Sequence, residues 1–265
     1  MKFGPPLDLG VLLQAIGELA ELYRGFPWES QVWATSGARR SPYRALILFG
    51  LSARTRDRLL VEMCHRFFQE FPDPNSLVAG WRYRGEVVRK IVRAGQLPFL
   101  ESVVRMIADS GGSVPGEREQ LKQIKGVGDK IAECVMAYGW GCEALPLDGN
   151  GCRVVSRIYD AASPNLSRDA GYLRGQLKDL YCGHKDWMAG RCADMVDLHE
   201  LLRLHGQLIC TKVPNCPCCP VSQCRFRKQA YAGSAKPIVS PGFWQEWRDL
   251  LLESAARTGD SNQTL

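Results

Sequence analysis

The chain has 265 residues, 45% of them hydrophobic, which is enough to bury a core in one or two domains and excludes disorder along the whole length. Its 34 lysines and arginines outnumber its 28 acids, and the formal net charge of +6 favours an anionic partner. No run reaches the roughly 18 apolar residues of a membrane helix, and the amino terminus lacks a basic start followed by an apolar run. We therefore expect a soluble, intracellular protein with no membrane partner.

The predicted elements are helices of ordinary length. Strand-like alternation is scarce, whereas apolar residues recur at helical spacing, first at Leu12, Ile16, Leu19 and Tyr23. Turn signals at residues 71–75 and 111–116 divide the chain into successive helices joined by short connections. A last amphipathic helix is predicted from Phe243, Trp244, Trp247, Leu250 and Leu251. The sequence thus predicts an all-α protein.

Positive charge gathers in two segments of the first hundred residues. Between Arg39 and Arg58 six arginines stand against one acid, and five cations at residues 82–93 stand against Glu86. Such clusters suit a phosphate backbone. Each cluster alone is equally well explained as a solvated helix face.

The segment 121–135 carries the most informative pattern. Gly126 and Gly128 bracket Val127 between two helical patterns, so the chain can turn tightly and restart a helix whose free N–H groups point outward. Such a turn can bind phosphate, and we expect Lys125, Gly126, Val127 and Gly128 to contact it. A plain turn between helices is the alternative.

An acid follows this hairpin, since Asp148 comes 18 residues after Lys130. Here the sequence resembles the helix-hairpin-helix DNA glycosylase superfamily, especially its endonuclease III branch. The resemblance assigns the catalytic roles to Lys130 and Asp148, which would face each other across a cleft. An unprotonated lysine is a nucleophile, and an aspartate can accept a proton and stabilise positive charge on a sugar. The structural alternatives are a solvated lysine and a helix N-cap.

Five of the eleven cysteines fall between Cys210 and Cys224, which indicates a metal site rather than disulfides. Four thiolates can hold a [4Fe–4S] cluster or one zinc ion. The segment, which follows Leu204-His205-Gly206, also resembles the iron–sulfur loop of the endonuclease III branch. The resemblance assigns the cluster ligands as Cys210, Cys216, Cys219 and Cys224.

This loop departs from the family pattern in its spacing, since the first and last intervals are each one residue shorter than usual. Cys218 is an extra thiol that can replace a neighbouring ligand, and zinc is the alternative metal. The loop would carry Lys212 and Arg225 towards phosphates. The other six cysteines are expected to be small buried apolar residues; they are Cys64, Cys134, Cys142, Cys152, Cys182 and Cys192.

Residues 42–57 resemble the helix and loop with which the family inserts a side chain into the duplex. Arg54 stands where the endonuclease III form has glutamine. Extruding a nucleotide leaves a gap in the stack, and we expect Arg54 to fill it and to pair with the orphan base.

The resemblance covers roughly residues 40–228 and implies two helical lobes. One is a six-helix barrel with the helix-hairpin-helix at 38–142; the other combines 1–37 and 143–232 and carries the [4Fe–4S] loop. Residues 233–265 would form a C-terminal helix and a flexible tail.

The implied function is base-excision DNA repair. We expect a monomeric, DNA-associated glycosylase and AP lyase that acts on double-stranded DNA containing a lesion or an abasic site. The base would be an oxidised or otherwise modified pyrimidine. The alternatives are a monofunctional mismatch or adenine-type glycosylase, an 8-oxoguanine glycosylase, a non-catalytic cluster-containing DNA-binding module, and a zinc-stabilised nucleic-acid binder. Leu147–Asn150 is similar to the adenine-mismatch enzymes, but Lys130 and Phe49 depart from their pattern.

Overall fold

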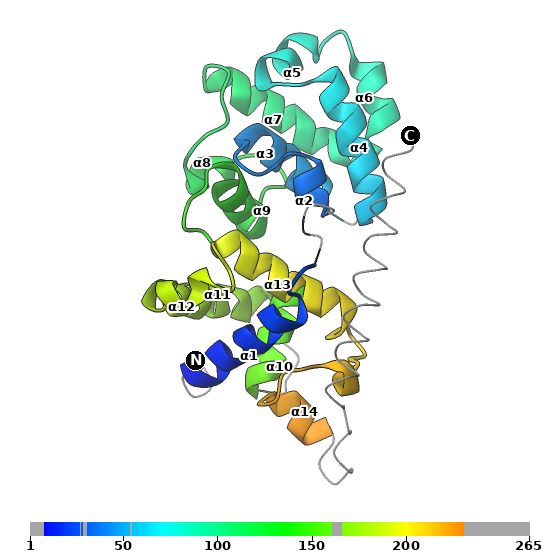
Figure 1. Ribbon diagram of the computed structural model, residues 1–265. Coiled ribbons are helices and arrows are strands. Elements are labelled where there is room, and N and C mark those ends of the chain that lie inside the picture. Colours follow the sequence, from blue (N-terminus) through cyan, green and yellow to red (C-terminus); the bar gives the residue numbers. More distant parts are fainter. Residues whose placement is uncertain (1–7, 27, 29–30, 54, 161–165, 231–265) are drawn as a thin grey trace. The chain divides into compact units, whose positions relative to one another are not determined.

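The computed structural model describes residues 8–26, 28, 31–53, 55–160 and 166–230 (Figure 1). This part of the chain is helical and contains no strand, which confirms the predicted all-α class. None of the described helices combines the length and the apolar character that crossing a bilayer requires. The helix predicted around Phe243–Leu251, the tail after it and Arg54 lie outside the described residues.

The chain divides into two compact units. The central unit is Trp28–Pro146, and the terminal unit combines Met1–Pro27 with Leu147–Leu265. The helices of the central unit are α2 (Val32–Thr35), α3 (Pro42–Leu51), α4 (Asp57–Glu70), α5 (Pro74–Gly80), α6 (Gly85–Ile91), η2 (Ala94–Gln96), α7 (Leu97–Asp109), α8 (Arg118–Leu121), α9 (Asp129–Cys134) and the π-helical turn η3 (Val135–Gly139). Those of the terminal unit are α1 (Leu9–Leu22), α10 (Gly149–Asp160), α11 (Leu166–Gly183), α12 (Lys185–Ala189), α13 (Met195–Leu208), η4 (Cys216–Cys218) and α14 (Arg225–Ala230).

Helix α3 forms the core of the central unit. It begins with Pro42 after the N-cap Ser41, whose side chain accepts a hydrogen bond from the Arg44 amide at 3.3 Å. α3 packs against η3 and α9. At Gly139 an added Cβ would lie 2.6 Å from Pro42 Cα, so only glycine allows this approach. The close packing fixes the hairpin helix α9 against α3.

Helix α10 forms the centre of the terminal unit and packs against α1, α11, α13 and α14. The last turn of α13 reaches the start of α10 at Gly206, where an added Cβ would lie 2.7 Å from Asn150 Cβ. Helix α1 contributes buried Leu12, Ile16 and Leu19. This unit is therefore built from both ends of the sequence.

The cysteines outside the loop depart in part from the prediction. Cys64, Cys134, Cys152 and Cys192 are buried as expected, but Cys142 and Cys182 are exposed. Cys142 follows η3 in a loop, and Cys182 is the last residue but one of α11. Because Cys142 lies in a loop and Cys182 at the end of a helix, both thiols are at the surface. The prediction that these two cysteines are buried is wrong.

Candidate functional site

The Gly126–Gly128 turn has the geometry that the sequence predicts. Gly126 has a φ of +89°, in the left-handed region that favours glycine. Val127 is buried at 5% exposure, and its amide donates to the Ile124 carbonyl at 2.9 Å. Gly128 is the N-cap of α9 and supplies no side-chain cap. Because Val127 points into the core, the turn offers a ligand its main chain together with the exposed side chain of Lys125.

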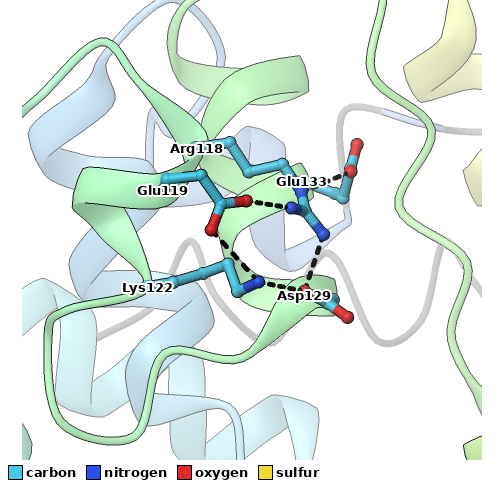
Figure 2. Close-up of polar contacts among 5 residues, drawn as sticks. All are labelled: Arg118, Glu119, Lys122, Asp129 and Glu133. Carbon is cyan, nitrogen blue, oxygen red and sulfur yellow. Dashed lines mark hydrogen bonds and ion pairs between the residues drawn. The ribbon is translucent and has the colours of Figure 1, made fainter.

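An ion-pair network joins the two helices of the hairpin (Figure 2). Arg118 on α8 donates from Nη2 to Asp129 Oδ1 at 2.6 Å and from Nε to Glu133 Oε1 at 2.9 Å, and it also contacts Glu119. Lys122 Nζ lies 3.1 Å from Asp129 Oδ1 and 3.4 Å from Glu119 Oε2. Hydrogen bonds to Asp129 and Glu119 raise the pKa of Lys122, so its side chain is a cation at neutral pH. The network was not foreseen from the sequence.

Lys130 is the second residue of α9 and is half-buried. Its Nζ lies 5.6 Å from the ring centroid of Phe49 on α3, a cation–π contact. Phe49 packs on Tyr138 with ring centroids 4.8 Å apart, and Tyr138 is fully buried. The predicted nucleophile therefore lies beside a rigid aromatic surface of the central unit.

Asp148 is the N-cap of α10. Its Oδ1 accepts from the amides of Asn150 at 2.9 Å and of Gly151 at 2.8 Å, which are the free donors of the first helical turn. The N-cap alternative weighed from the sequence is thus confirmed, and capping fixes the carboxylate. Asp148 belongs to the terminal unit and Lys130 to the central unit.

A chain of hydrogen bonds leads from Asp148 to the cysteine loop. Asn150 Nδ2 donates to Asp148 Oδ2 at 3.2 Å, and Asn150 Oδ1 accepts from Arg153 Nη2 at 2.8 Å. Arg153 Nε then donates to the Cys210 carbonyl at 2.8 Å, while its Nη2 also donates to the Gly206 carbonyl at 2.7 Å. Helix α10 thereby connects the predicted catalytic carboxylate to the first predicted metal ligand.

The four predicted ligands form one electrostatic group. Burial, followed by the neighbouring thiols Cys224, Cys210 and Cys216, raises the pKa of Cys219 to about 12. Burial together with Cys224 and Cys210 likewise raises the pKa of Cys216. For Cys218 burial is the cause that raises the pKa. These thiols therefore lie near enough to influence one another's ionisation.

Side chains that the sequence did not reveal surround these thiols. His205 Nε2 lies 3.4 Å from Cys219 Sγ, and its Nδ1 lies 3.2 Å from the Tyr23 hydroxyl. Burial lowers the pKa of His205 to about 3, so the ring is neutral. Arg157 is buried, lies 3.5 Å from Cys210 Sγ and donates to two loop carbonyls, those of Thr211 at 2.5 Å and Lys212 at 3.0 Å.

The charges around these thiols would partly balance those of an anionic, thiolate-ligated group. Arg157 is joined by Arg227, which donates to the Cys219 carbonyl at 2.9 Å. Burial raises the pKa of Cys216, and both guanidinium groups partly oppose that rise. A buried Arg157 and a half-buried Arg227 would offset charge that deprotonated cysteines bring. Among the described residues, no set of three or more His, Cys, Asp or Glu side chains is arranged so as to hold a metal ion.

The predicted phosphate contacts of the loop are accessible. Lys212 and Arg225 are both exposed, and the Arg225 guanidinium lies 5.5 Å from the centroid of the Tyr159 ring. Arg54, the predicted duplex-inserting residue, lies outside the described residues.

Comparisons with known proteins place this site in context. No family model matches the chain. A thymine-DNA glycosylase of Aeropyrum pernix is 27% identical over 163 residues, which is 59% of this chain and 70% of the relative. Endonuclease III of Buchnera aphidicola is 25% identical over 192 residues, 71% of this chain and 83% of the relative.

Solved structures agree in fold. A trapped covalent intermediate of endonuclease III with DNA matches with a TM-score of 0.65 and 22% identity, over 84% of this chain and 99% of that one. Together these likenesses confirm the predicted resemblance to the helix-hairpin-helix DNA glycosylase superfamily and its endonuclease III-like branch.

Proposed function

We propose that this protein is a base-excision DNA repair glycosylase that also cleaves the strand at the abasic site. The observation that carries the proposal is the position of Lys130, two residues after Gly128 and half-buried beside Phe49. The names of the relatives, a thymine-DNA glycosylase and an endonuclease III, support a base-removing enzyme. The substrate class is a modified or mismatched pyrimidine in double-stranded DNA.

DNA binding uses the main chain of the turn and the exposed cations. The main chain of the Gly126–Gly128 turn and the side chains of Lys125, Lys212 and Arg225 contact phosphates. Arg54 fills the gap left by the extruded nucleotide. Together these contacts bind the DNA backbone in this proposal.

Catalysis begins when Lys130 Nζ attacks C1′ of the flipped nucleotide. The C1′–N bond to the base breaks, the electron pair leaves with the base, and the new C–N bond to lysine becomes a Schiff base when the sugar ring opens. Loss of a proton from C2′ then expels the 3′ phosphate by β-elimination. Asp148 accepts the lysine proton and stabilises positive charge on the sugar. Capping holds the Asp148 carboxylate in one orientation for this role.

The cysteine loop holds a metal group in this proposal. Cys210, Cys216, Cys219 and Cys224 bind a [4Fe–4S] cluster, with zinc as the alternative. When bound, the group crosslinks the loop and so holds its cations in place. Arg157 and His205 orient the loop main chain and the Cys219 thiol.

A second candidate is a monofunctional glycosylase. It is favoured by the thymine-DNA glycosylase relative and by Asp148, whose fixed carboxylate can also activate a water molecule. In that reaction water attacks C1′, and no covalent adduct forms.

The test is borohydride trapping on a duplex with one abasic site. The unaltered chain should form a covalent adduct, and Lys130→Gln should form none. Lys125→Gln is the matched control, since it removes a neighbouring lysine of the same hairpin, weakens binding and leaves trapping possible. An adduct or full strand cleavage by Lys130→Gln would overturn the lyase assignment. Absence of an adduct from a chain that binds the duplex would favour the hydrolase, or a non-catalytic binder if no base is released.

A further inference from the structure

The first residue of α9 is an acid beside the turn proposed to contact phosphate. Asp129 follows Gly128 directly, and its side chain is 53% exposed. A DNA phosphate that reaches the turn would approach this carboxylate. Two like unit charges about 4 Å apart in water weaken association by about fivefold. The hairpin therefore needs a way to cancel the charge of Asp129.

Two cations meet one oxygen of this acid. Arg118 Nη2 lies 2.6 Å and Lys122 Nζ 3.1 Å from Asp129 Oδ1. Arg118 is held from its other side, because its Nε donates at 2.9 Å to Glu133, whose side chain is only 13% exposed. As Figure 2 shows, the guanidinium lies between the two carboxylates of α9. Its orientation towards Asp129 is thus fixed by a nearly buried partner.

We propose that Arg118 is a positioning residue for DNA binding, which joins α8 to α9 and masks the charge of Asp129 so that the turn can receive a phosphate. The inference rests on the proposed DNA-binding role of the hairpin and deepens it. It assigns the network a function besides stability. It also explains why an acid is tolerated next to the turn.

Two other roles for Arg118 predict different results. If Arg118 only ties the helices together, its loss weakens binding regardless of the charge on Asp129. If Arg118 itself contacts a phosphate, its loss reduces the slope of log Kd against log salt by about 0.9, whatever residue 129 is. Masking predicts instead that removing the carboxylate compensates for removing the guanidinium.

The experiment is a double-mutant cycle on the full chain. Arg118→Met, Asp129→Asn and the double variant are compared by fluorescence anisotropy on a duplex with a tetrahydrofuran abasic analogue, over a salt series. Arg118→Met should bind about fivefold weaker than the unaltered chain, whereas Asp129→Asn should bind about as tightly, because the charge that it removes is already masked. The double variant should recover at least the original affinity with an unchanged salt slope. A double variant as weak as Arg118→Met would overturn masking, as would a gain from Asp129→Asn in the unaltered chain that equals its gain in the Arg118→Met background.

Glu119→Gln is the matched control. Glu119 contacts the same two cations but lies on α8 and is 70% exposed. In the Arg118→Met background its neutralisation should restore less affinity than Asp129→Asn does, and an equal gain would mean that only net charge matters. Thermal unfolding of each variant separates binding effects from misfolding. If the unaltered chain fails to bind the duplex, the proposed function fails; if it binds and the cycle shows no coupling, only the masking role fails.

Discussion

Asp148 and Arg153 form hydrogen bonds to the nitrogen and to the oxygen of the same side-chain amide, that of Asn150. The Nδ2 of Asn150 donates to Asp148 at 3.2 Å, and its Oδ1 accepts from Arg153 at 2.8 Å. Since Arg153 also donates to the Cys210 carbonyl, the carboxylate is held by a path that ends in the cysteine loop. The position of Asp148 therefore depends on the order of that loop.

Replacing Asp148 separates its capping role from its chemistry. Asp148→Ala should lower the free energy of unfolding by about 1 kcal/mol, because two amides of α10 lose their acceptor. Asp148→Asn should keep most of that stability, since asparagine caps a helix as well as aspartate does. Both variants should lose base excision. Urea unfolding and single-turnover excision measure the two effects, and an active Asn variant would show that the residue acts only as a cap.

Arg153→Met should disturb the position of the Asp148 carboxylate although Asp148 itself is unchanged, because Arg153 acts on it through Asn150. Hydrogen bonds to a charged group contribute about 1.5–3 kcal/mol, so the loop and the start of α10 should loosen. Hydrogen exchange at the Asn150 and Gly151 amides should become faster, and excision slower at saturating DNA. Arg157→Met is the control, because Arg157 holds the Thr211 and Lys212 carbonyls of the same loop. If Arg157→Met accelerated exchange at the Asn150 and Gly151 amides as much as Arg153→Met does, a path through Arg153 would be refuted.

Cysteine variants distinguish ligands from the extra thiol. Cys219→Ala should lose the bound metal group, because Cys219 is one of the four proposed ligands. Cys218→Ala should retain it. Iron, sulfide and zinc analysis of the purified variants provides the measurement and decides between a cluster and zinc. Loss of metal from Cys218→Ala would show that Cys218 is a ligand.

Cys64 should make stability fall at alkaline pH. Burial raises the pKa of this thiol from 9.0 to about 12. Between these values the unfolded chain releases a proton that the folded chain keeps, so the free energy of unfolding decreases as pH rises, by up to about 1.4 kcal/mol per pH unit for one thiol. Cys64→Ala should flatten the dependence measured by urea unfolding between pH 9 and 10.5. Cys142→Ala, which removes an exposed thiol, is the control and should leave the dependence as steep as before.

Local features of the fold and site could be predicted from the sequence. The all-α class follows from apolar spacing, and the turn at Gly126 follows from paired glycines, one of which has a φ of +89°. The N-cap at Asp148 was foreseen as the alternative to catalysis. Each of these depends on residues a few positions apart, where backbone sterics and periodicity decide. The predicted ligand and DNA-contact roles and the lobe bounds stay predictions.

Partners brought together by tertiary packing could not be predicted. Tyr23 meets His205 across 182 positions, and Arg157 reaches Thr211 across 54. Within the hairpin, Arg118 and Glu133 are 15 positions apart and pair because α8 and α9 pack together. No repeat or motif in the sequence identifies such pairs. A charged residue on a helix is interpreted as solvent-exposed unless the positions of its neighbours in the fold are known.

The discontinuous make-up of the terminal unit constrains the order in which the chain can mature on the ribosome. The central unit, Trp28–Pro146, is continuous and can complete its own contacts as soon as it has been synthesised. Helix α1 is made before the central unit, yet its partners α10 and α13 come only after that unit. Until α10 and α13 are synthesised, the apolar side chains of Leu12, Ile16 and Leu19 stay uncovered, so the nascent α1 is a natural target for chaperones that bind apolar segments.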